Sequence, residues 1–375
     1  MERDFGISLG DNTNSNQYNE LRWFNDVLDG KSINPDSGAD NNPVPGANND
    51  YQDEFNAEGL DGSIPWYQVL GNHDYLWLGA HPANDYIRQY YTGGNILDLG
   101  DIFHDPLGIE SRGIYGGAIN GGTVFGDIIG AGPVEDFASP PKVLAANYNR
   151  RPLSKKEWKN EFLNPSTGPV GLGLNLTSSI FGCYSFEPKE NLPIKVIVLD
   201  NTQKEEDFNL HQHGYIDNER YEWLVAELDK GQAEGKLMII AAHIPLVIVG
   251  YVGHSPVSAA NLIAKLHEYP NFVLWISGHI HRNKAYVFKS PDKAKPELAF
   301  WHVETSSLRD FPQQFRTFEI VRNSDNTISI FATNIDPVMK EGSLTAKSRS
   351  YAIAEHQIIK LAMDNGSYNA ELIQP

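Results

Sequence analysis

Short apolar segments that stop abruptly at a polar residue recur along this chain, and they constrain its fold more than any other feature. They cover residues 5–9, 66–70, 194–199, 237–242 and 272–276. Apolar runs of this length, bounded by glycine and polar residues, are typical of buried β-strands. Residues 218–228 lie between two of these segments and carry apolar side chains at helical spacing. The alternation of strands and helices predicts an α/β fold.

The last third of the chain has the pattern of a different kind of sheet. Residues 300–303, 317–321 and 327–333 have the composition of strands, and residues 323–326 have that of a hairpin turn. We therefore expect antiparallel strands in this part of the chain.

Two long stretches fall outside this regular pattern. Residues 29–63 are rich in Gly, Pro, Asn and Asp, which favours a long surface loop. Residues 76–193 have many glycines and aromatic residues but few periodic helices. We interpret them as an inserted cap or loop region of one domain that spans residues 1–375, because long ordered loops are often functional. The alternative is decoration that does not contact a substrate.

The composition excludes several classes of protein. With 30 Lys and Arg residues against 48 Asp and Glu residues, the net charge is −18, so we expect no nucleic-acid-binding surface. A small phosphorylated substrate would need local positive charge, which bound divalent cations supply. Cys183 is the single cysteine, which excludes an internal disulfide and a cysteine-built zinc site. No apolar run reaches the ~20 residues of a membrane span, so we expect none. The sequence does not indicate in which cellular compartment the protein lies.

Side chains that bind metals follow four of the predicted strands, at the point where each strand ends. In an open α/β sheet, ligands bind at the carboxyl ends of the strands. The residues are Asp11, Asn72, His73, Asp74, His243, His279 and His281. His279 and His281 are two positions apart, so in an extended segment both imidazoles would point to the same side. A single strand-end histidine is more often structural, but the complete set predicts a metal site.

These residues stand in four motifs that also have a family order. The motifs are Gly10-Asp11, Gly71-Asn72-His73-Asp74, His243 and Gly278-His279-Ile280-His281. Over residues 10–281 the chain resembles the calcineurin-like metallophosphoesterases. The resemblance implies a two-sheet β-sandwich flanked by helices, and hydrolysis of a phosphate monoester or diester. It also implies two divalent metal ions, Mn, Fe, Zn or Ni, whose bound hydroxide attacks the phosphorus.

The resemblance further implies a division of the metal ligands. Asp11 would bridge the two ions of this dinuclear metal centre. Asn72, His243 and His279 would complete the ligands of one ion, and His281 would bind the other.

Two residues would take catalytic roles without binding a metal. By the same resemblance, His73 would protonate or stabilise the leaving oxygen, and Asp74 would help orient the His73 side chain. An imidazole suits this role because its unperturbed pKa lies near ~6.5.

One block of the family pattern is missing, because no Asp-x-His precedes Gly10. We expect the chain to lack the first strand of the fold, either because the sequence is a truncated form or because this is a divergent one-metal member. We favour truncation, since the other motifs are intact. The second reading leads to a rival function, in which the protein binds a phosphorylated ligand without turnover.

A serine hydrolase is a further alternative, since Gly6, Ser8 and Gly10 match the Gly-x-Ser-x-Gly pattern. A nucleophile elbow needs strands before it and a helix directly after it, whereas a polar, Asn-rich segment follows here. We therefore regard Ser8 as the weaker candidate.

Four more residues have functional interpretations beside structural ones. His211 and His213 form a His-x-His pair in a polar loop, for which we favour a surface role or a role in supporting the ligands over direct ligation. His254 follows the His243 segment and is a candidate substrate-binding residue. Asp200 ends the strand at 194–199 and would either orient a ligand histidine or begin a turn.

Overall fold

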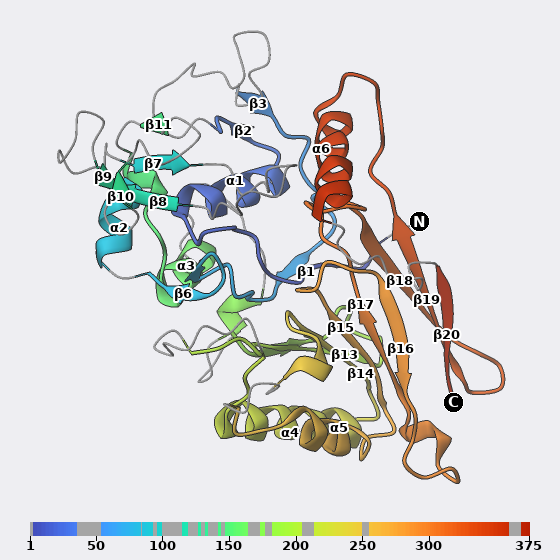
Figure 1. Ribbon diagram of the computed structural model, residues 1–375. Coiled ribbons are helices and arrows are strands. Elements are labelled where there is room, and N and C mark those ends of the chain that lie inside the picture. Colours follow the sequence, from blue (N-terminus) through green and yellow to red (C-terminus); the bar gives the residue numbers. More distant parts are fainter. Residues whose placement is uncertain are drawn as a thin grey trace.

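The computed structural model shows a mixed α/β protein with several sheets, as the alternation of segments predicted (Figure 1). The residues that the structure describes are 3–35, 54–83, 85–92, 96–99, 115–118, 127–128, 132–133, 142–143, 147–163, 173–176, 182–204, 214–249, 255–359 and 369–375. Among the helices in these ranges, none is both long enough and apolar enough to cross a bilayer.

A six-stranded sheet forms the centre of the molecule. Across the sheet, its strands are β12 (Tyr184–Phe186), β13 (Ile194–Leu199), β14 (Leu237–Ala242), β15 (Phe272–Ser277), β17 (Phe300–Glu304) and β16 (Lys284–Phe288). β13, β14, β15 and β17 run parallel, whereas β12 and β16 pair antiparallel at the two edges. The parallel strands are nearly continuous apolar runs because both of their faces are covered.

The strand register brings the carboxyl ends of the parallel strands to one edge of this sheet. Leu199 of β13 pairs with Ala242 of β14, and Ala241 pairs with Ile276 of β15. The segments that follow these strands therefore emerge side by side, and His243 is the first residue after β14.

A second parallel pair of strands ends beside the same edge. β1 (Gly6–Ser8) pairs with β4 (Trp66–Gln68), and Ser8 lies opposite Gln68 in the register. Both strands are followed by predicted metal-binding residues. Helix α1 (Tyr18–Leu28) begins shortly after β1.

Helices α4 (Asn218–Ala233) and α5 (Ala259–Leu266) lie together on one side of the central sheet (Figure 1). The helix predicted at 218–228 is thus confirmed, and it extends further toward the C-terminus. The Asp217 side chain caps α4 by accepting a hydrogen bond from the Arg220 amide at 2.9 Å. Leu224 and Leu228 are fully buried against the sheet. Each such leucine contributes about 1.5–3 kcal/mol relative to an exposed one.

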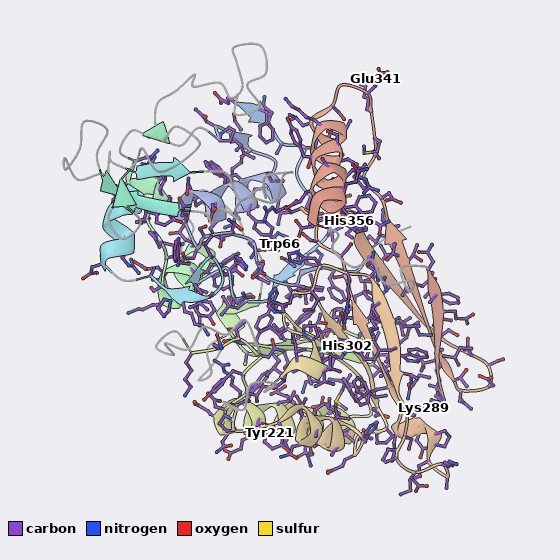
Figure 2. All side chains as sticks on the ribbon, viewed as in Figure 1. Trp66, Tyr221, Lys289, His302, Glu341 and His356 are labelled. Atoms are coloured by element: carbon purple, nitrogen blue, oxygen red, sulfur yellow. The ribbon has the colours of Figure 1, made fainter. Side chains whose placement is uncertain are left out.

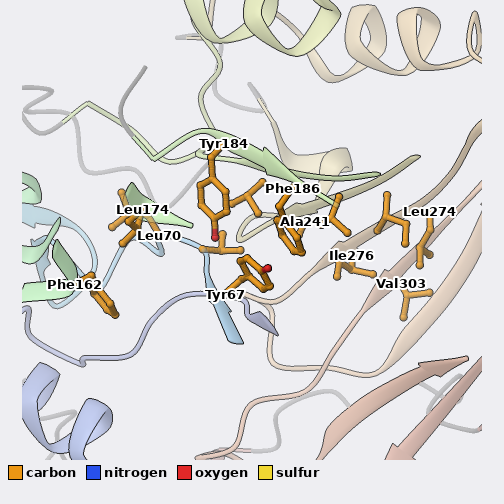
Figure 3. Close-up of a cluster of buried hydrophobic side chains, with 14 of the residues drawn as sticks. Tyr67, Leu70, Phe162, Leu174, Tyr184, Phe186, Ala241, Leu274, Ile276 and Val303 are labelled. Carbon is orange, nitrogen blue, oxygen red and sulfur yellow. The ribbon is translucent and has the colours of Figure 1, made fainter. Parts of the chain in front are cut away.

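The other face of the central sheet packs on a mixed core (Figure 3). This cluster includes Tyr67 of β4, Phe186 of β12 and Ile276 of β15. The Tyr67 and Phe186 rings stack with their centroids 3.5 Å apart. Packing across this core holds the β1–β4 pair against the central sheet.

Three antiparallel strands near the C-terminus contribute side chains to the same core. They are β18 (Phe315–Arg322), β19 (Ile328–Ile335) and β20 (Ala370–Gln374). The antiparallel pairing predicted for 317–321 and 327–333 and the turn predicted at 323–326 are confirmed, with Asn326 in the left-handed conformation that such a turn requires. The prediction for 300–303 is wrong in part, because β17 lies inside the central sheet, where it runs parallel to β15 and antiparallel to β16. Helix α6 (Leu344–Ile359) lies near one end of this sheet (Figure 1).

The two stretches predicted as loops contain short elements. Residues 29–63 include the strand pair β2 (Ser32–Ile33) and β3 (Phe55–Asn56), and residues 36–53 lie outside the described ranges. β12 lies near the end of the stretch 76–193, so this part of the stretch belongs to the central sheet. The other helices and strands are β5 (Leu76–Trp77), β6 (His81–Pro82), α2 (Asp85–Thr92), β7 (Ile96–Leu99), β8 (Tyr115–Ala118), β9 (Asp127–Ile128), β10 (Gly132–Pro133), β11 (Lys142–Val143), α3 (Lys155–Leu163), and the 3-10 helices Tyr148–Arg150, Leu174–Leu176, Leu246–Ile248 and Pro296–Leu298.

Candidate metal centre

Four of the predicted ligand side chains meet where β1, β4, β14 and β15 end. The Nε2 atom of His243 lies 3.1 Å from Asp11 Oδ2 and 3.0 Å from Asn72 Oδ1. The Nδ1 atom of His279 lies 3.0 Å from Asn72 Oδ1 and 3.2 Å from His243 Nε2. The fold thus gathers four donor atoms from distant parts of the sequence.

Hydrogen bonds on the outer side of these residues aim the donor atoms inward. The Nδ1 atom of His243 donates to the Leu9 carbonyl at 2.7 Å, which leaves a lone pair on Nε2. The side-chain amide of Asn72 donates to the Gly79 carbonyl at 2.9 Å, so its oxygen faces the histidines. A histidine that donates its second ring nitrogen to a backbone carbonyl is the common arrangement in metal sites.

The donor set fits a divalent cation. With its proton on Nδ1, His243 presents a lone pair to two oxygen atoms that also carry lone pairs, an arrangement that needs a shared proton or cation. Two donors on neighbouring positions of one ion, each about 2.0–2.1 Å from it, are roughly 3.0–3.4 Å apart. The spacings of 3.0 to 3.2 Å fall in this range. Two imidazoles, a carboxylate and an amide suit Mn, Fe, Zn or Ni and do not select among them.

Electrostatics couples Asp11 and His243. Burial raises the pKa of the Asp11 carboxyl, but His243, helped by His73 and His279, outweighs it and holds this pKa well below its ordinary value. Burial lowers the pKa of His243, and the nearby Asp11 carboxylate raises it above its ordinary value. A proton on His243 is therefore the natural competitor of a cation at this site.

Asp74 ties two of the ligand loops together. Its Oδ2 atom accepts hydrogen bonds from the Asp11 amide at 3.0 Å and the Gly71 amide at 2.8 Å, and Oδ1 accepts one from the Asn12 amide at 2.8 Å. Burial, together with the negative charge of Asp11, raises the pKa of Asp74 to about 7. Both carboxylate oxygens thus bind backbone amides, so the contacts of Asp74 are those of a residue that positions the loops.

His73 lies beside the four donors. Its backbone amide donates to Asp11 Oδ1 at 2.9 Å, and its ring Nδ1 donates to the Asn14 carbonyl at 2.6 Å. With the proton on Nδ1, the Nε2 atom carries a lone pair or takes up a proton. A Cβ placed on Gly79 would come within 2.4 Å of this Nε2, so the close approach requires a glycine there.

His281 is not a member of the group of donor atoms around Asp11. Among the described residues, the His, Asp, Glu and Cys side chains that form a group of three, with ligand atoms within 4.8 Å of one another, are Asp11, His243 and His279. The Nδ1 atom of His281 instead bonds the Asp310 carboxylate, which the sequence analysis did not single out. Asp310 lies in a loop without apolar periodicity, so the sequence carried no signal for it.

The prediction that His279 and His281 lie in an extended segment is wrong. His279 and His281 have φ angles of 68° and 56°, in the left-handed region, so their segment is not a strand and its side chains do not alternate. Asp11 also has a left-handed φ of 57°. Such non-glycine conformations cost of order 1–3 kcal/mol each and cluster at functional sites.

A polar network that includes the buried residues His302 and Glu304 lies next to the loop of His279. Arg282 donates two hydrogen bonds to the Glu304 carboxylate, at 2.5 and 3.2 Å, and Tyr286 bonds His302 at 2.7 Å. His302 lies among the strands of the central sheet (Figure 2). Burial and the charge of Arg282 lower the pKa of His302 to about 3, so this histidine is neutral. The sequence carried no signal for Tyr286, His302 and Glu304, because they lie within strands whose apolar neighbours dominate the pattern.

Asp200 and Asn201, which directly follow β13, have different structural roles. Asp200 is fully buried and lies 3.3 Å from both Lys155 Nζ and Arg220 Nη2. Asn201 exchanges hydrogen bonds with the backbone of Ile244, at 2.7 and 3.1 Å. Asn201 therefore braces the residue next to His243, while Asp200 joins helices α3 and α4 to the sheet.

Of the remaining candidates, the structure describes Ser8. Ser8 is the last residue of β1, and its hydroxyl donates to Asn12 Oδ1 at 2.8 Å, so it does not form a nucleophile elbow. His211, His213 and His254 lie outside the described residues.

Comparison with solved structures found similarity to a dimetal phosphatase from Danio rerio, at 13% sequence identity and a TM-score of 0.31. The match covers 42% of this chain and 58% of that chain. A TM-score this low carries no argument about the chemistry of this chain. Neither the protein-family models nor the curated proteins gave a match.

Proposed function

We propose that this chain is a metal-dependent phosphoesterase of the calcineurin-like class, with a two-sheet sandwich as its fold. The observation that carries the proposal is the convergence of Asp11, Asn72, His243 and His279, with donor atoms 3.0 to 3.2 Å apart and lone pairs directed at one another. In a chain with a net charge of −18, a bound cation would supply the local positive charge that a phosphate group requires.

The residues divide the work between holding a cation and moving a proton. A bound divalent cation neutralises phosphoryl oxygens and lowers the pKa of water. Asp11, Asn72, His243 and His279 would hold it. His73, whose Nδ1 donates to the Asn14 carbonyl, would carry a proton on Nε2 for the leaving oxygen.

The number of cations depends on His281. In the dinuclear form, Asp11 and His281 would share a second cation, and Asp310 would orient the His281 ring. In the alternative, one cation is bound and the protein holds a phosphorylated ligand without hydrolysing it. We keep this second candidate because His281 is not in the group that Asp11, His243 and His279 form.

Turnover assays separate the two functions. We expect the Mn-supplemented protein to hydrolyse an aryl phosphate or an aryl phosphodiester, and to lose activity with a chelator. Asp11→Ala, His243→Ala and His279→Ala should each abolish hydrolysis, whereas His213→Ala, outside the proposed ligand set, should retain most of it. Mn binding by calorimetry without turnover of any ester would favour the binding protein. Near-normal rates in the three ligand variants would contradict the proposal.

A further inference from the structure

The loop formed by residues 307–313 touches two of the candidate ligand loops. The Asp310 carboxylate bonds His281, and the guanidinium of Arg309 reaches Asn14 Oδ1 at 3.5 Å. The carbonyl of Asn14 is the group that holds the His73 ring. Arg309 therefore stands on the His73 side of the site.

Hydrogen bonds hold this loop in place, so Arg309 starts from a fixed backbone. The Ser307 hydroxyl accepts hydrogen bonds from the Arg309 amide at 2.9 Å and the Asp310 amide at 3.3 Å. The side chain of Gln313 donates to the Arg309 carbonyl at 2.8 Å and to Ser348 of helix α6 at 2.9 Å. A braced backbone lowers the entropy cost of presenting a side chain to a ligand.

The charge of Arg309 is only weakly engaged by the protein. The side chain is 68% exposed, and its Nε lies 3.9 Å from Asp310 Oδ1, the limit of an ion pair. The other oxygen of Asp310, Oδ2, bonds His281 Nδ1. The contact with Asn14 is long for a hydrogen bond. An exposed guanidinium with its donors largely open is suited to bind a carboxylate or phosphate in a bidentate manner.

We propose that Arg309 binds a second anionic group of the substrate, carried by the leaving group. This inference rests on the proposed function, in which His73 protonates the leaving oxygen. Arg309 and His73 both contact Asn14, so the guanidinium would be near enough to the His73 side of the site to meet a charged leaving group. The preferred substrates are accordingly phosphate esters whose leaving group bears a carboxylate or a further phosphate.

A pair of matched substrates tests this inference. Wild-type protein with Mn should hydrolyse 4-carboxyphenyl phosphate with a kcat/KM about fivefold above that of phenyl phosphate, as a partly exposed ion pair provides. Arg309→Ala should remove this preference and leave phenyl phosphate within about twofold, while Arg309→Lys should keep part of it. Arg322→Ala, at the β18–β19 hairpin, is the matched control and should change neither rate.

Binding of non-hydrolysable analogues keeps the inference separate from the proposed function. Calorimetry on the Mn-loaded protein should show that 4-carboxyphenylphosphonate binds about fivefold tighter than phenylphosphonate, and that Arg309→Ala abolishes the difference. Hydrolysis of both esters without an Arg309-dependent preference would overturn the inference and leave the phosphoesterase standing. Absence of hydrolysis with an Arg309-dependent binding difference would overturn the phosphoesterase and leave the anion site standing. Absence of both would overturn both.

Discussion

Single residues fix this site through atoms that do not face its centre. His243 donates its Nδ1 proton to Leu9, and Asn72 donates its amide protons to Gly79. His73 donates to Asn14 in the same way. Each bond removes a rotational choice, so the inward atom is already aimed before a cation arrives. Pre-aimed donors of this kind are the physical basis of a well-defined metal site.

Gly71 offers a test at this scale. A Cβ at position 71 would lie 2.2 Å from Asp11 Oδ1, and Asp11 is held in place by Asp74. Gly71→Ala should therefore displace Asp11, weaken Mn binding by at least about tenfold and cost about 1–3 kcal/mol of stability. Gly62→Ala, where a Cβ meets nothing within 4 Å, is the control and should change neither quantity. Calorimetric titration with Mn and denaturant unfolding measure the two effects, and equal Kd values for both variants would argue against the geometry.

The protonation of His243 predicts how metal binding depends on pH. Its pKa is raised by the Asp11 carboxylate despite burial, so without metal the proton stays on at pH values somewhat above the ordinary 6.5. A proton and a cation compete for Nε2, so the Kd for Mn should rise as the pH falls from 8 to 6. Calorimetry in buffers of different ionisation enthalpy should show proton release on binding. Binding that is independent of pH and releases no proton would rule out His243 as a ligand.

At the scale of secondary structure, periodicity in the sequence predicted the regular elements well. The parallel strands, helix α4 and the β18–β19 hairpin lie where their apolar patterns indicated, because burial of one or both faces dictates such patterns. The segment 279–281 was misjudged because its left-handed turns follow from local contacts that no pattern encodes. Arg309, Asp310 and Asn201 were missed for the same reason, since loop residues acquire their partners only through the fold.

The junction between β13, α3 and α4 supplies a stability test at this scale. Burial raises the pKa of Asp200, but Arg220 and Lys155 outweigh it and lower this pKa below the ordinary 3.8. Asp200 therefore contributes stability that is present above pH 3.8 and is lost as the pH falls through its lowered pKa. Asp200→Asn should lower the free energy of unfolding at pH 7 by about 3–5 kcal/mol, because two buried cations lose their counter-charge.

Denaturant unfolding between pH 7 and pH 3 measures this effect. The difference between wild type and Asp200→Asn should shrink toward the acid end. Asp336→Asn, whose side chain is 62% exposed, is the control and should stay within about 0.5 kcal/mol of wild type. A constant difference at all pH values would mean that the ion pairs do not control the pKa of Asp200.

At the scale of the whole molecule, the architecture brings the ends of strands from two sheets together. Strands β1 and β4 come from the N-terminal part, and β14 and β15 come from the central sheet, and their ends supply the four donors. The α/β class followed from the sequence. The meeting of the two sheets did not follow from periodicity, because it depends on packing such as that of Tyr67 on Phe186. The prediction that all four donors lie in one site came instead from the order of the motifs.

Anomalous X-ray scattering from crystals grown with Mn tests the central claim most directly. The predicted result is a strong anomalous peak within about 2.0–2.3 Å of Asp11 Oδ2, Asn72 Oδ1, His243 Nε2 and His279 Nδ1. A second peak beside His281 would identify the dinuclear form. Ordered side chains at these positions with no peak among them, at saturating Mn, would contradict the account.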